Sequence, residues 1–138
     1  MALYKHVENK EELLDGMVEV IVGEVDPPVR DADWKSAVRQ RVLSARRALQ
    51  RHPWARRVIE SRTNKTPAVL DYMDSFTGMF LAGGFSVDLT HHVMHAIATT
   101  MSPDDGSIVG HGCDDQFEFE FALDLLLDGS LACSAWIG

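Results

Sequence analysis

The strongest constraint on the fold is a regular series of signals that stop one helix and start the next. Pro27-Pro28, His52-Pro53 and Gly83-Gly84 each interrupt a stretch whose apolar residues recur at three- and four-residue spacing. Proline lacks a backbone donor and pushes the residue before it out of the helical region, and glycine favours the left-handed conformation that ends many helices. A chain interrupted in this way is expected to form short helices joined by brief connections.

Each of these stretches also begins at a residue that can cap a helix. Asn9 stands three residues before Glu12 in a capping-box pattern, and Asp33, Thr66 and Ser86 occupy equivalent positions later in the chain. The sequence therefore predicts an all-α fold of about six helices. Their expected ranges are 10–25, 33–51, 54–62, 67–82, 87–100 and 115–129, the last with Asp114 or Asp115 as its cap.

The predicted second helix is amphipathic. Its apolar residues lie at helical spacing, while its arginines and Gln40 are expected on the opposite, solvated side. The apolar positions are Trp34, Ala37, Val38, Val42, Ala45, Ala48 and Leu49.

The last predicted helix has an ambiguous beginning. Residues 117–121 alternate phenylalanine with glutamate, which by itself indicates a half-buried strand. Residues 122–129 do not alternate, they are strong helix formers that end at a glycine, and no second strand pattern exists for pairing, so a helix is predicted. One face then carries Phe117, Phe121 and Leu125, and another carries Phe119, Leu123, Leu126 and Leu127. A helix that is apolar on two faces is buried on two sides, and the second side is most simply another subunit.

Composition restricts the function. A chain of 138 residues fits one domain, and its net charge of −8 argues against a protein that neutralises DNA phosphates over its whole surface. Basic residues are concentrated between Lys35 and Lys65, which we interpret as a solvated helix face, and none follows Asp71. Two cysteines give no disulfide framework, and neither a signal peptide nor a membrane span is visible, so a cytoplasmic protein is expected.

Catalytic motifs are not found in the sequence. It has no nucleophile elbow, phosphate-binding glycine loop or paired-cysteine motif, so we expect no enzyme and no cofactor. Asp88, His91 and His95 share one helical face and could ligate a metal, but we favour partly exposed histidines on a helix packed through its apolar residues. The acidic residues of the last helix, which are Glu118, Glu120, Asp124 and Asp128, are interpreted as solvated or capping groups.

Aromatic and methionine side chains suggest a binding pocket. Such groups suit adaptable pockets because methionine is unbranched and polarizable, and they suit ordinary cores equally well. The candidate pocket residues are Trp54, Met73, Phe76, Met79 and Phe80, with His92 and His95 as polar contacts.

The N-terminal segment Leu3-Tyr4-Lys5-His6-Val7-Glu8-Asn9-Lys10-Glu11-Glu12-Leu13-Leu14-Asp15 resembles the end of the helix-turn-helix in TetR-family regulators. In that family a LYxHV segment ends the recognition helix and xNKxxLL opens the connecting helix. Two later stretches are also similar to the family: residues 48–55 (ALQRHPWA) followed by Ser61-Arg62, and residues 117–129 (FEFEFALDLLLDG), which look like its closing dimerisation helix.

This resemblance implies a TetR-type regulatory domain that forms a homodimer through a four-helix bundle and encloses a small-molecule effector. Residues 1–8 would be the remnant of the recognition helix and residues 9–138 the ligand-binding and dimerisation domain. The resemblance places Leu3, Tyr4 and His6 where the recognition helix touches DNA and Lys10 where a backbone phosphate is contacted. It places the dimer interface at Val93, Ile97, Phe117, Phe121, Leu123 and Leu126.

The sequence departs from the family at its beginning. A helix-turn-helix is a three-helix unit, and this sequence starts at Met1 inside the recognition helix. One turn of helix is not stable in isolation, so these 138 residues alone are not expected to bind an operator specifically. A fragment, a misplaced start codon and a real loss of the DNA-binding head are all open.

The predicted function is that of a TetR-like transcriptional repressor, of which this chain is mainly the effector-binding and dimerisation domain. The helix at residues 10–25 would connect the DNA-reading segment to the core. The alternative is a stand-alone small-molecule-binding or interaction module that has lost DNA binding. A third class, an all-α enzyme with metal on the histidine helix, would be revealed by elemental analysis.

Overall fold

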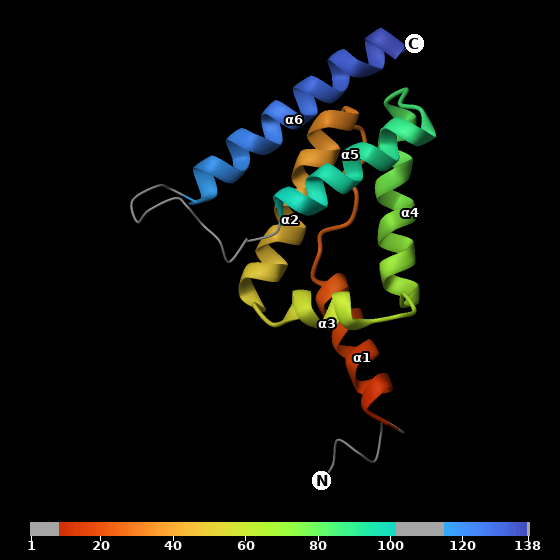
Figure 1. Cartoon of the computed structure of the whole chain (residues 1–138), viewed down its shortest axis with the longest axis vertical. Coiled ribbons are helices and arrows are strands. Elements are labelled where there is room, and N and C mark those ends of the chain that lie inside the picture. Colours follow the sequence, from red (N-terminus) through yellow and green to blue (C-terminus); the bar gives the residue numbers. More distant parts are fainter. Residues whose placement is uncertain (1–8, 102–114, 138) are drawn as a thin grey trace. The chain divides into compact units, whose positions relative to one another are not determined.

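The computed structural model describes residues 9–101 and 115–137, and within these ranges it contains helices and no strand (Figure 1). The helices are α1 (Lys10–Gly23), α2 (Trp34–Arg51), α3 (Ala55–Ser61), α4 (Pro67–Ala82), α5 (Val87–Thr100) and α6 (Asp115–Ile137). The all-α prediction is therefore confirmed, and five of the six helices begin and end within two residues of their expected bounds.

The predicted caps form as hydrogen bonds. Asn9 Oδ1, Asp33 Oδ1 and Ser86 Oγ each accept from the backbone N–H three residues further on, at 2.9, 3.0 and 3.2 Å. Thr66 Oγ1 accepts in the same way at 3.4 Å, and Pro67 follows it at the first helical position. These side chains satisfy backbone donors that the first turn of a helix otherwise leaves unpaired.

The end of α4 is a Schellman motif built on glycine. Gly84 has a φ of 88°, which is the left-handed region where a side chain is strained. Its N–H donates to the Leu81 carbonyl at 3.0 Å, and the Phe85 N–H donates to the Phe80 carbonyl at 3.1 Å. The two phenylalanine rings meet at 5.4 Å between centroids, which is the apolar contact that accompanies this motif.

The prediction that the last helix ends at Gly129 is wrong, because α6 continues to Ile137. A glycine inside a helix costs about 1 kcal/mol relative to alanine, which tertiary packing can offset. The buried positions Leu123, Leu127 and Ser130 keep one helical stripe in contact with the core across the glycine. Ser130 Oγ also donates to the Leu126 carbonyl of the preceding turn at 2.6 Å.

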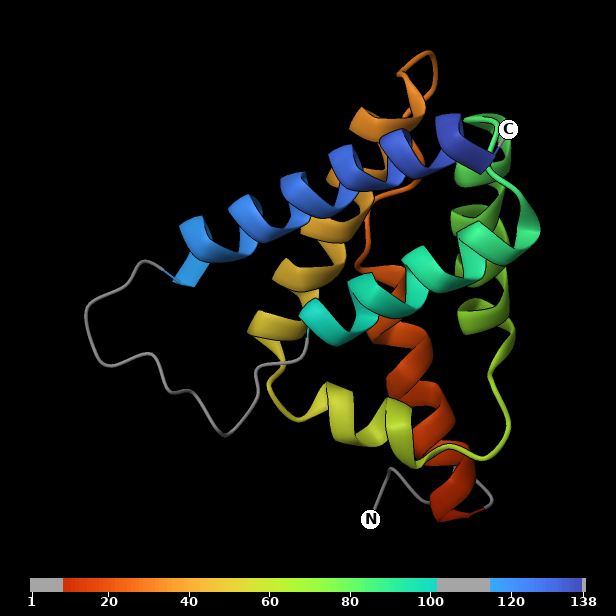
Figure 2. The same ribbon diagram turned by 45° about the horizontal axis from the view of Figure 1, so that its top comes forward.

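The described chain divides into two compact units. The first, here called the α1–α3 unit, contains α1, α3, residues 40–51 of α2 and residues 67–76 of α4. Within it α1 packs against α3 (Figure 2). Its buried apolar residues include Val18 and Ile21 of α1 and Ala55 of α3.

The second, here called the α5–α6 unit, contains residues 32–39, the end of α4, α5 and α6. Within it α5 packs against α6. Trp34 lies against Phe80 and Phe85 at centroid distances of 6.0 and 4.7 Å. The indole also covers Gly83 so closely that a Cβ there would lie 2.6 Å from its Cγ, so this position requires glycine. None of the described helices is both long enough and apolar enough to cross a membrane.

Candidate dimerisation and effector-binding surfaces

The outward face of α6 is apolar and exposed. Three large side chains repeat every four residues on this face, and three more follow the opposite, buried face. Phe117, Phe121 and Leu125 are 66%, 58% and 58% exposed, whereas Phe119, Leu123 and Leu127 are 6%, 1% and 0% exposed. The prediction that this helix is apolar on two faces is confirmed. Large apolar side chains that are exposed together on one helical face are typical of a contact site.

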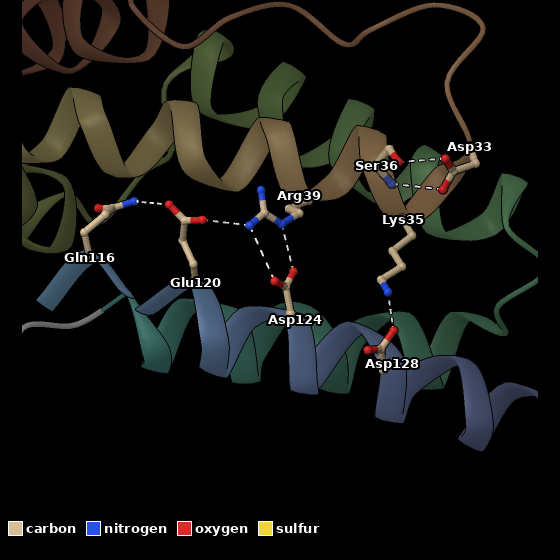
Figure 3. A network of polar contacts seen from close by, with 8 residues as sticks. All are labelled: Asp33, Lys35, Ser36, Arg39, Gln116, Glu120, Asp124 and Asp128. Carbon is tan, nitrogen blue, oxygen red and sulfur yellow. Dashed lines mark hydrogen bonds and ion pairs between the residues drawn. The ribbon is translucent and has the colours of Figure 1, made fainter. Parts of the chain in front are cut away.

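A ladder of ion pairs follows a third stripe of α6 (Figure 3). Arg39 Nε donates to Asp124 Oδ1 and its Nη2 donates to Glu120 Oε2, both at 2.8 Å. One helical turn away along α6, Lys35 pairs with Asp128. The carboxylates of Glu120, Asp124 and Asp128 are 36%, 43% and 61% exposed, in keeping with the solvated positions expected from the sequence, and each is also paired with a basic residue of α2. Hydrogen bonds to Asp124 and Glu120 raise the pKa of the Arg39 guanidinium.

This ladder fixes which face of α6 points outward. The acidic positions 120, 124 and 128 recur every four residues, so they can all meet the start of α2 only in one rotation of the helix. Gln116 Nε2 also donates to Glu120 Oε1 at 2.7 Å. The hydrogen bond from Gln116 and, to a smaller extent, the one from Arg39 lower the pKa of the Glu120 carboxyl. With this rotation set, the Phe117–Leu125 stripe is left uncovered within the described chain.

The six residues expected at a dimer interface fall into two groups. Phe117 and Phe121 are exposed on α6. Val93 and Ile97 of α5 and Leu123 of α6 are buried inside the α5–α6 unit, and Leu126 is partly buried. Val93, Ile97 and Leu123 are thus packed inside the subunit, and Phe117 and Phe121 are the members of this set with exposed side chains.

The candidate pocket residues are distributed over both units. In the α1–α3 unit, Phe76 is buried and stacks on Tyr72 at 5.7 Å, whereas Trp54 and Met73 are 42% and 43% exposed. Trp54 is the cap of α3 and meets the His52 ring edge-on at 5.6 Å.

In the α5–α6 unit, Phe80 is fully buried in the aromatic cluster around Trp34, and Met79 is partly buried. His92 and His95 are both exposed on α5. The His91 ring lies 5.8 Å from that of His92 and 6.0 Å from that of His95. Among the described residues no group of three histidine, cysteine or carboxylate side chains, Asp88 included, is placed to hold a metal ion.

Sequence reasoning missed the one arginine of α2 that points into the protein. Arg41 was expected on the solvated side, but it is 8% exposed. Its Nη1 donates to the Asp26 carbonyl at 2.6 Å and its guanidinium lies 4.8 Å from the centre of the Tyr72 ring. The helical register of α2 predicts this burial, because Arg41 stands four residues after Ala37 and four before Ala45, both of which are core positions.

The comparisons with known proteins agree with this architecture. Residues 27–104, which include α2 to α5, match the model of the family described as "Tetracyclin repressor-like, C-terminal domain". The chain belongs to the TetR family. An "HTH-type transcriptional regulator" of Saccharopolyspora erythraea is 31% identical over 85 residues, which are 61% of this chain and 36% of that relative. The match thus spans little more than a third of the relative's length.

Solved structures of similar proteins show the same fold. Apo ActR from Streptomyces coelicolor superposes with a TM-score of 0.78 at 21% identity, covering 99% of this chain and 80% of ActR. BioQ from Mycobacterium smegmatis gives a TM-score of 0.74 at 21% identity, covering 95% of this chain and 78% of BioQ. At this level of identity the similarity establishes the architecture alone.

The α1 helix of this TetR-family chain is held to its own unit by ion pairs. Arg62, which follows α3, donates to Asp15 Oδ1 at 2.8 Å and to Glu11 Oε2 at 2.5 Å. Both hydrogen bonds raise the pKa of the Arg62 guanidinium, and the bond to Glu11 has the larger effect. At the other end of α1, His52 lies 2.9 Å from Glu24 Oε1, and hydrogen bonds from His52 and then Arg51 lower the pKa of that carboxyl.

Part of the basic stretch between residues 35 and 65 is therefore used in holding the fold together. Of the residues that the resemblance assigns to DNA, Lys10 is exposed at the start of α1. Leu3, Tyr4 and His6 lie outside the described residues, as does Asp114, which was a candidate cap for the last helix.

Proposed function

We propose that this chain is the dimerisation and effector-binding domain of a TetR-family transcriptional repressor, with residues 9–138 as that domain and residues 1–8 as the end of a recognition helix. The observation that supports dimerisation is the exposed stripe of Phe117, Phe121 and Leu125 beside a fully packed inner face. A second copy of the same stripe, related by two-fold symmetry, would cover these rings.

Effector binding is supported by family membership and by a relative of the same fold. ActR has been solved in complex with actinorhodin, a structure that superposes on this chain with a TM-score of 0.75. By analogy, a small molecule bound in this domain would favour one arrangement of the dimer and lower its affinity for operator DNA. The α1 helix would transmit the change, since it is the segment that leads from residues 1–8 into the domain.

The dimer is tested by placing a charge on the outward stripe. Phe121→Glu would bury an unpaired carboxylate in a two-fold interface, at a cost of about 3 kcal/mol or more. We expect association to weaken by about 100-fold or more, so that the variant sediments as a monomer where the wild type is a dimer. Analytical ultracentrifugation over a range of concentrations measures this.

Val20→Glu is the matched control, because Val20 is equally exposed on α1, and this variant should remain dimeric. An unchanged mass for Phe121→Glu would rule out the interface. An electrophoretic shift with the full gene product and the DNA upstream of its gene tests the repressor. If no shift occurs, the alternative of a stand-alone binding module is favoured.

A further inference from the structure

Arg41 is a buried cation that forms no ion pair with any carboxylate among the described residues. Its Nε atom is buried and has no hydrogen-bond partner among the described residues, and its Nη1 is bound to a neutral backbone carbonyl. A buried charge is normally paired, because removing an ion from water costs several kcal/mol that a neutral partner does not return.

The groups nearest to Arg41 do not supply the missing charge. The Asp26 carboxylate is directed to Nη2 of Arg47 at 3.4 Å and is 71% exposed, so only the Asp26 main chain serves Arg41. Burial raises the pKa of the Tyr72 phenol, so the ring beneath the guanidinium stays neutral near pH 7. The ring offers a flat apolar surface with a negative face, which suits a cation and also a stacked organic group.

The present contacts of Arg41 also hold the connection between α1 and α2. The Asp26 carbonyl accepts from Arg41, and the Asp26 N–H donates to Ser44 Oγ at 2.8 Å. Both partners lie on α2, and Ser44 is 2% exposed. The chain directly after α1 is thus attached to α2 by two hydrogen bonds, and in one of them a stronger acceptor could replace the neutral Asp26 carbonyl.

We propose that Arg41 binds the carboxylate of a small organic acid, which takes the place of the Asp26 carbonyl, so that the effector of this domain is an anion. A charge-assisted hydrogen bond is about twice as strong as one to a neutral carbonyl, and the planar guanidinium can bind a carboxylate through two donors. The exchange would free the Asp26 carbonyl, which is one of the groups that attach Asp26 to α2, and so couple the charge of the ligand to the segment that follows α1. This inference rests on the proposed effector-binding function.

The test compares acids with their own amides on the whole chain. Benzoate, 4-phenylbutyrate and octanoate are each titrated against benzamide, 4-phenylbutyramide and octanamide, with dissociation constants taken from calorimetry. For the wild type we expect at least one acid to bind about tenfold or more tightly than its amide, the effect of one hydrogen bond to a charged group. The Nε–H resonance of Arg41 in a ¹⁵N spectrum should shift on adding that acid and not on adding the amide.

Arg41→Gln keeps a neutral donor for the Asp26 carbonyl and removes the charge, so it should bind acid and amide within about twofold of each other. Arg41→Lys, which keeps the charge, should retain part of the preference and serves if the glutamine variant fails to fold. Arg57→Gln is the matched control, since it makes the same change of charge at an exposed position of α3, and it should behave as the wild type.

Two results would overturn the inference and they have different meanings. If acids and amides bind the wild type equally, or if Arg41→Gln keeps the preference, the domain binds small molecules without Arg41 and the proposed function stands. If no acid and no amide binds, and the Arg41 resonance does not move, the anion site is wrong and effector binding loses its support as well.

Discussion

The two apolar faces of α6 have almost the same composition and opposite environments. Phe119, Leu123 and Leu127 lie in the core, whereas the Phe117–Leu125 stripe carries two phenylalanines and a leucine in the open. Helical spacing generates both faces equally well, so the sequence pattern contains no information about which one the subunit covers. What distinguishes them is the acidic stripe between them, which is bound to Lys35 and Arg39. Charge placement, rather than hydrophobicity, sets the rotation of this helix.

The largest difference in the free energy of unfolding is expected between a leucine-to-alanine change on the buried face of α6 and one on its exposed face. Leu127→Ala leaves a cavity at a fully buried position and should lower the free energy of unfolding by about 2–5 kcal/mol. Leu125→Ala removes the same atoms from the exposed face and should change it by less than about 0.5 kcal/mol. Urea unfolding measures both, in a Phe121→Glu background so that association does not contribute. Equal losses for the two leucines would show that both faces are buried in the subunit itself.

A smaller effect is expected from the stripe between the faces. Arg39→Met removes both of its ion pairs, which are about one-third exposed, and exposed pairs contribute at most about 1 kcal/mol each. We therefore expect a loss of about 1 kcal/mol in the free energy of unfolding at low salt, shrinking in 1 M NaCl because the wild-type pairs are screened. A loss that is independent of salt would mean that the aliphatic part of Arg39, and not its charge, holds α6 in place.

Local signals in the sequence predicted the fold well, because caps and proline breaks act over a few residues. Asn9, Asp33, Thr66 and Ser86 form the expected bonds, and Gly84 the expected turn. The course of α6 beyond Gly129 was missed because packing on Leu127 and Ser130 outweighs a weak local preference, and such packing is not visible along the chain.

The candidate site was less predictable, since it depends on contacts between distant segments. Phe80 is as hydrophobic as Phe121, yet one lies against Trp34 in the core and the other is exposed. The pairing of Arg39 with Asp124 joins residues 85 positions apart, which periodicity cannot show. The charge of Arg41 predicts a solvated position, whereas its helical register predicts a core position, and the structure follows the register.

The smallest expected effect is on stability at acid pH, and it tests how much the ion pairs of Glu120 contribute to holding α6. Hydrogen bonds from Gln116 and then Arg39 lower the pKa of Glu120 below its ordinary value of 4.5. The unfolded chain therefore binds this proton more tightly than the folded one, so the stability that Glu120 contributes is present above pH 4.5 and is lost as pH falls through the lowered pKa. Glu120→Gln cannot take part in this loss. Its urea midpoint should lie below that of the wild type at pH 7, and the difference should close below pH 4.5.

Glu118→Gln makes the same change in net charge at an exposed position of α6 and is the matched control. A difference that stays constant from pH 7 to pH 3 would assign the contribution of Glu120 to packing, and the rotation of α6 would then depend on Asp124 and Asp128.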